Sequence, residues 1–127
     1  MKLRIKGNSI RLRLLRSEVE KFGAAGVFEE TINFGASKLT YILRQTTGID
    51  ELSANFSDDE ITIFVPSKTA QNWTETELIT LAGEQLISGG EILKILVEKD
   101  FVCLDRPDDE DNKDAYPNIS HKCQTPN

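Results

Sequence analysis

Hydrophobic and polar residues alternate strictly from Lys2 to Leu14. Leu3 and Ile5 alternate with basic residues, and after Gly7-Asn8-Ser9 the same pattern resumes with Ile10, Leu12 and Leu14. A period of two on both sides of a Gly-Asn turn predicts a β-hairpin with one apolar face. We expect that face to lie in the core and the basic face to point away from it.

A short helix is expected next, because Ser17 can act as its N-cap and Glu20 stands at the capping-box position. Strands are expected over residues 27–34 and 39–44. The following section repeats this order. It predicts strands at 52–56 and 61–65 around an acidic turn, a helix at 67–73 started by Ser67, and strands at 78–87 and 92–99.

The two sections align at a constant offset of 51 residues, which places Ile10 on Ile61 and Phe22 on Trp73. The pattern predicts two ββαββ halves, about residues 1–48 and 49–104. One half alone is too short to bury a sufficient core. We therefore expect a mainly β (α+β) fold in which the duplicated units form one compact barrel or sandwich with two short helices. Residues 105–127 are expected to form an acidic, partly ordered tail.

Charge is distributed unevenly along the chain. The net charge is −6, yet residues 1–51 carry +3 and residues 52–127 carry −9. No apolar run is long enough to span a membrane, and three basic residues interrupt the first apolar positions, so we expect a cytoplasmic protein with no membrane partner. Cys103, Cys123 and His121 match no zinc pattern, and we expect free thiols, no metal, no cofactor and no catalytic residues.

The basic side of the first hairpin is the candidate surface, and it consists of Lys2, Arg4, Lys6, Arg11 and Arg13. It can bind an anion or a nucleic acid, or it can be a solvated face neutralised across strands by Glu29, Glu30, Glu98 or Asp100. A third hypothesis has the acidic segment 105–114 fold back over it.

The stretch from Lys6 to Phe22 resembles the first half of the swapped-hairpin DNA-binding domains of the AbrB and MazE type. The resemblance covers roughly residues 2–45 and implies that two ββαββ units interleave. It also implies DNA contacts by Lys6, Asn8, Arg11 and Arg13, with Lys2 and Arg4 in support. The acidic turn Asp58-Asp59-Glu60, at the equivalent place in the second half, would repel phosphate.

The chain also resembles an uncharacterised group of small bacterial proteins. The shared features are the opening KGNSIRLRL, a closing strand like Leu96–Phe101 and a tail like Asp114–Asn118. We expect a non-enzymatic binding or interaction module, monomeric or homodimeric, with a protein partner. A DNA-binding transcriptional regulator or antitoxin is the alternative.

Overall fold

The computed structural model describes residues 1–100, 114 and 116, and every structural statement below concerns these residues. Strands and helices follow one another in the order β-β-α-β-β, and this order then repeats. The elements are β1 (Lys2–Lys6), β2 (Ser9–Leu14), α1 (Arg16–Ala25), β3 (Val27–Asn33), β4 (Lys38–Thr46), β5 (Ser53–Ser57), β6 (Glu60–Pro66), α2 (Ser67–Glu75), β7 (Thr80–Leu86) and β8 (Ile92–Lys99).

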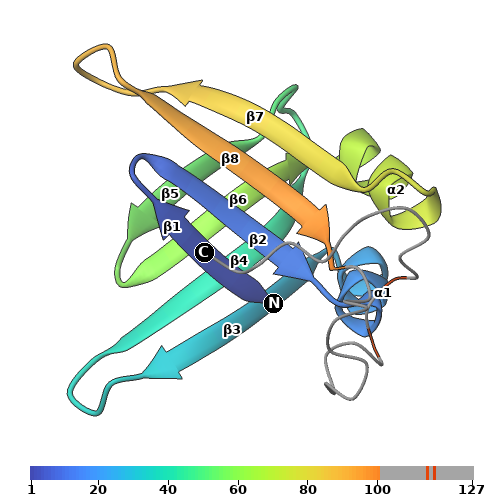
Figure 1. Ribbon diagram of the computed structural model, residues 1–127, viewed down its shortest axis with the longest axis horizontal. Coiled ribbons are helices and arrows are strands. Elements are labelled where there is room, and N and C mark those ends of the chain that lie inside the picture. The colour runs from blue at the N-terminus through green and yellow to red at the C-terminus, as the bar shows by residue number, and fades with distance from the viewer. Residues whose placement is uncertain (101–113, 115, 117–127) are drawn as a thin grey trace.

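The strands form two four-stranded sheets, in the orders β1-β2-β8-β7 and β3-β4-β6-β5. Each sheet therefore combines one hairpin from the first half with one from the second (Figure 1). The central pairs, β2–β8 and β4–β6, are parallel, and Leu12 lies opposite Val97 as Leu43 lies opposite Ile63. The predicted mainly β fold with two short helices is confirmed, and the sheets form a two-layer arrangement rather than a closed barrel.

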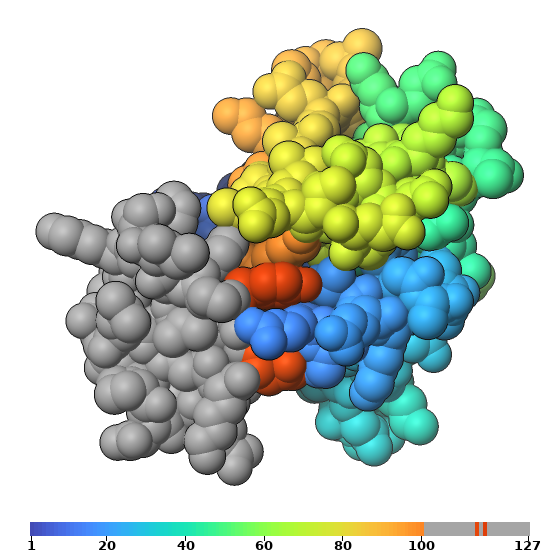
Figure 2. All heavy atoms as spheres, turned by 90° about the vertical axis from the view of Figure 1, so that its right-hand side faces the viewer, coloured from blue at the N-terminus to red at the C-terminus, as the bar shows by residue number. Residues whose placement is uncertain are grey.

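The two helices lie side by side at one end of the sheets (Figures 1 and 2). Phe22 of α1 and Trp73 of α2 are fully buried there. Gly23 of α1 faces Thr74 of α2, and a Cβ atom at Gly23 would lie 3.4 Å from Cβ of Thr74, in van der Waals contact. The helices thus close one end of the space between the sheets.

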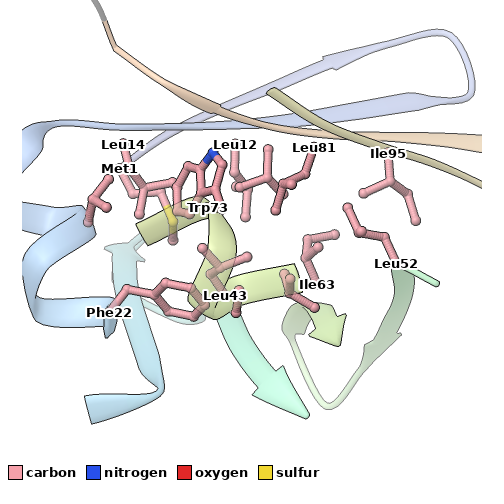
Figure 3. Close-up of a cluster of buried hydrophobic side chains, with 14 of the residues drawn as sticks. Met1, Leu12, Leu14, Phe22, Leu43, Leu52, Ile63, Trp73, Leu81 and Ile95 are labelled. Carbon is pink, nitrogen blue, oxygen red and sulfur yellow. The ribbon is translucent and has the colours of Figure 1, made fainter. Parts of the chain in front are cut away.

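The core draws on both halves of the chain (Figure 3). Leu12 and Leu14 of the first hairpin meet Leu43 and Ile63 of the other sheet, with Trp73 beside them. A side-chain contact to the backbone also joins the sheets, since Ala54 N donates to Oε1 of Gln85 at 2.7 Å. Neither half could form this core alone.

The predicted start of the first helix is wrong. α1 begins at Arg16, so Ser17 lies inside the helix, and Leu15 N donates to Oε1 of Glu18 at 2.8 Å. The Asp114 carboxylate caps one free N–H of the first turn, since it accepts from Ser17 N at 3.1 Å, and it also accepts from Ser17 Oγ. Ser67 is likewise the first residue of α2 rather than its cap. The predictions for segment 105–113, both cysteines and His121 lie outside the described residues.

Candidate functional site

Three rows of side chains cross the outer face of sheet β1-β2-β8-β7. They point outward because their neighbours along each strand, such as Leu3, Leu12 and Val97, point into the core. The rows are Lys2, Arg13, Glu98 and Thr80; Arg4, Arg11, Leu96 and Ala82; and Lys6, Ser9, Lys94 and Glu84. We call the six bases among them the basic face.

Part of the basic face is neutralised within the sheet. Oε1 of Glu98 lies 3.0 Å from Nε of Arg11 and 3.8 Å from Nη2 of Arg13, so two guanidinium groups share one carboxylate. Thr80 Oγ1 donates to the other oxygen of Glu98 at 3.2 Å. Lys2 Nζ pairs with Asp100 at 3.2 Å. The predicted cross-strand pairing is confirmed for Glu98 and Asp100.

The same prediction is wrong for the other two acids. Glu30 lies on the core-facing side of β3 and binds the α-amino group of Met1 at 2.6 Å. Glu29 lies on the outer face of the second sheet, opposite Ile42, and so cannot reach the basic face.

The other three bases of the face have no carboxylate within ion-pair distance among the residues that the structure describes. Arg4 lies opposite Arg11, and Lys6 and Lys94 lie on either side of Ser9. Lys94 was not predicted, because only the parallel register of β2 and β8 brings it to this face. These three side chains are the part of the face that can accept an outside anion.

Asn8 is hydrogen-bonded within its own sheet, to residues at the start of β8. Its side-chain amide donates to the carbonyl oxygen of Ile92 at 2.8 Å, and its own carbonyl accepts from Lys94 N at 3.1 Å. The turn is thereby fixed to the start of β8. Thr40 N donates in the same way to Asp59 O at 3.0 Å in the other sheet.

The outer face of the second sheet has a different chemistry on an equivalent frame. At the 51-residue offset, Thr62 stands where Arg11 stands and Phe64 where Arg13 stands. On β5, Ser53 and Asn55 replace Lys2 and Arg4. The concentrated positive charge is therefore a property of one sheet only.

An open cleft of about 810 Å³ lies beside the edge strand β7. Glu84 and Lys94 line this cleft and also lie in the third row of side chains on the outer face of sheet β1-β2-β8-β7. The side chain of Leu52 fits against Gly83, where an added Cβ would lie 2.9 Å from Cβ of Leu52. The lining residues are Asp50, Glu51, Leu52, Thr69, Thr80, Leu81, Ala82, Gly83, Glu84, Lys94, Ile95 and Leu96.

Two other polar clusters hold the fold together. Met1 contributes its α-amino group to Glu18 and Glu30, and its carbonyl accepts from Tyr41 Oη at 2.9 Å. Burial alone would raise the pKa of Glu30, but the hydrogen bond and charge of the Met1 ammonium outweigh it and lower the pKa. Burial and the hydrogen bond to Glu30 raise the pKa of Tyr41 to about 12.

Lys99 forms the second cluster. Its Nζ donates to Thr76 O at 2.7 Å and lies over the rings of Trp73 and Tyr116, at 5.6 and 5.3 Å from their centroids. Burial lowers the pKa of Lys99. Arg16 lies on Tyr116 as well, at 5.6 Å. Tyr116 is thus held against Arg16 and Lys99 by two cation–π contacts.

Among residues 1–100, 114 and 116, no cluster of three or more metal-ligating side chains occurs. No helix in this part of the chain has both the length and the apolar character needed to cross a membrane.

These features define a small, mainly β protein with one strongly charged sheet face. The chain belongs to a family of unknown function, DUF7009, which matches residues 1–120. Comparisons with curated proteins and with solved structures give no match.

Proposed function

We propose that the protein is a non-enzymatic binding module, which holds an acidic segment of a partner protein against the basic face. One observation carries the proposal. Arg4 and Lys6 on β1 and Lys94 on β8 point from the same face of one sheet, and none of them forms an ion pair among the described residues, although Glu84 lies opposite Lys94; Arg11 and Arg13 are already held in place by Glu98. A partner carboxylate would form charge-assisted hydrogen bonds with Arg4, Lys6 and Lys94.

The position of β1 suggests how such a segment docks. β1 is an outermost strand of its sheet, so its far edge has no strand partner among the described elements. A partner strand can add to such an edge through main-chain hydrogen bonds. Every second side chain of the added strand would then face Lys2, Arg4 and Lys6, which favours a segment with acidic residues at alternate positions.

A protein partner fits this face better than DNA does. The rows contain no aromatic side chain on which the bases of a single-stranded nucleic acid could stack. The equivalent face of the second sheet lacks the bases, so the two sheets cannot present the same charge to the two halves of a DNA site. The antitoxin or regulator hypothesis remains the alternative outcome of the test.

The test compares a synthetic peptide of alternating Glu and Thr with a DNA duplex of equal charge. We expect the peptide to bind at low salt and its affinity to fall as salt rises. The variant Arg4→Ala/Lys6→Ala should bind the peptide at least about tenfold more weakly. The matched control, Lys21→Ala/Lys68→Ala, removes the same charge elsewhere and should change affinity by less than about twofold.

Two results would overturn the proposal. In the first, the face variant and the control variant lose the same affinity, which would reduce the effect to net charge. In the second, the duplex binds more tightly than the peptide and Arg11→Glu/Arg13→Glu abolishes that binding. This result would support the DNA-binding regulator instead.

The acidic segment 105–113 enters the proposal as a competitor within the same chain. Its flanks are held near the basic face, because Tyr116 N donates to Asp100 O at 2.7 Å and Asp100 pairs with Lys2. Replacing the acids of 105–113 by their amides keeps Asp114 and Tyr116 in place. We expect this variant to bind the acidic peptide more tightly, and unchanged affinity would remove the competitor from the proposal.

The repeated element order supports one further part of the proposal. The interleaved hairpins and the equivalent contacts Lys94–Asn8 and Thr40–Asp59 are what a duplicated ββαββ unit would give. The protein would then be a single-chain counterpart of an AbrB-like swapped-hairpin dimer. In this proposal it acts in the bacterial cytoplasm.

A further inference from the structure

The end of the molecule opposite the helices is formed by the tips of four hairpins (Figure 1). Seven large hydrophobic side chains are exposed in the described part of the chain, and six of them belong to these hairpins. The seventh, Leu78, follows α2 at the other end. The six are Ile5 (60% exposed), Ile32 (44%), Phe34 (66%), Phe56 (68%), Leu86 (76%) and Ile92 (45%).

Ile5 and Phe56 show why these side chains are exposed. They occupy equivalent positions on β1 and β5, opposite Ile10 and Ile61, on the side of each strand that faces the core. The helices close the core at the other end, whereas here the hairpins extend beyond it. Ile5 and Phe56 therefore continue the core, whereas Leu86 and Ile92 lie opposite each other on the outer face that also carries Glu84 and Lys94. Exposed apolar side chains gathered at one end of a molecule are typical of an interaction surface.

The two hairpin tips of the first half are basic, and the two tips of the second half are acidic. Lys6 lies at the β1–β2 tip and Lys38 at the β3–β4 tip, and both are basic. The tips that correspond to them in the second half are acidic, with Asp58, Asp59 and Glu60 at β5–β6 and Glu91 at β7–β8. Each basic tip of the first half thus has an acidic counterpart in the second.

We propose that this end binds a second copy of the chain, to form a symmetric homodimer. In a two-fold contact, β1–β2 of one copy faces β5–β6 of the other, and the reverse contact follows by symmetry. The basic tips then meet acidic tips at both contacts, and the exposed Ile5 and Phe56 lie between them. The opposite signs of equivalent tips are the argument for a second copy, because one surface then supplies both halves of the complementarity.

The first experiment measures the molar mass of the full chain by sedimentation over a concentration series. We expect a reversible dimer, and we expect Phe56→Asp to weaken it at least about tenfold. Since Phe56 is mostly exposed, this variant should still fold. Leu78→Asp, which adds the same charge near α2, should leave the dimer unchanged. A wild-type chain that remains monomeric at every concentration would overturn the proposal.

The second experiment exchanges charges between the tips. Asp58→Asn/Asp59→Asn/Glu60→Lys/Glu91→Lys makes all four tips basic, and Lys6→Glu/Lys38→Glu makes all four acidic, so each variant alone should dimerise at least about tenfold more weakly. An equimolar mixture should form a heterodimer, because opposite charges face each other again at every tip. A mixture that dimerises as weakly as each variant alone would refute the tip-to-tip arrangement. Both experiments measure self-association in the absence of peptide, so this proposal can fail while the proposed function stands.

Discussion

Phe22 and Trp73 meet edge to face between the two helices, with ring centroids 6.1 Å apart and ring planes at 69°. Both are fully buried, and each comes from a different half of the chain. Trp73 Nε1 also donates to Ile79 O at 2.9 Å, so the indole is held by this hydrogen bond as well as by the contact with Phe22. The pair joins the two halves at the end where the sheets are covered.

Truncation of this contact should destabilise the whole fold. We expect Phe22→Ala to lower the free energy of unfolding by about 3–5 kcal/mol, because a fully buried aromatic ring is removed and a cavity remains. Urea unfolding followed by Trp73 fluorescence measures the change. Leu78→Ala is the control for an exposed apolar side chain and should cost less than about 1 kcal/mol. An equal effect of both substitutions would contradict the central place of Phe22.

The Asp58-Asp59 turn is a site where stability can be gained. Both residues have positive φ, at 51° and 61°, as a two-residue hairpin turn of type I′ requires. Asn tolerates this region and Gly adopts it without strain, so Asp58→Asn/Asp59→Gly should raise the free energy of unfolding by about 1 kcal/mol in dilute solution. Gly7→Ala tests the reverse at φ 55°, where nothing blocks the added Cβ, and should cost about 1 kcal/mol.

Most of the strands could be predicted because their pattern is local. The alternation in the first hairpin and the apolar runs around 61–65 and 92–99 correspond to β2, β6 and β8 within one or two residues. The sheet to which each hairpin belongs could not be derived from alternation. It depends on contacts such as Leu12 with Val97, which lie far apart along the chain. Interleaved hairpins are implied only by the resemblance of the first half to swapped-hairpin domains.

The basic face was predicted in part. Lys2, Arg4, Lys6, Arg11 and Arg13 share a face because strand alternation requires it. Lys94 could have been found only from the register of β2 and β8. The cap of α1 shows the same limit, since Ser17 and Glu20 match a local signal while the capping carboxylate comes from Asp114. A local pattern cannot reveal a partner that arrives from the other end of the chain.

Asp114 should matter for stability out of proportion to its position near the C-terminus. Its carboxylate accepts from Ser17 N, and its carbonyl accepts from Arg16 N at 2.8 Å, at the positive end of α1. We expect Asp114→Ala to lower the free energy of unfolding by about 1–2 kcal/mol. In the Ser17→Ala background the same change should cost less, because one of the lost hydrogen bonds is already absent. An unchanged urea midpoint would show that the cap does not contribute.

Tyr41 should couple the stability of the fold to alkaline pH. Its pKa is raised to about 12 in the folded protein, against 10.0 normally, mainly by burial and then by the hydrogen bond to Glu30. The folded state thus keeps the proton where the unfolded state loses it. The contribution is complete below pH 10 and disappears as pH rises towards 12. Tyr41→Phe should be less stable than wild type at pH 9, because the hydrogen bond to Met1 O is lost, and this difference should shrink between pH 10 and 12. Urea unfolding of both proteins at several pH values checks this, with Tyr116 present in both as an internal control. A difference that stays constant up to pH 12 would show that the Tyr41 hydroxyl is not held in its neutral form.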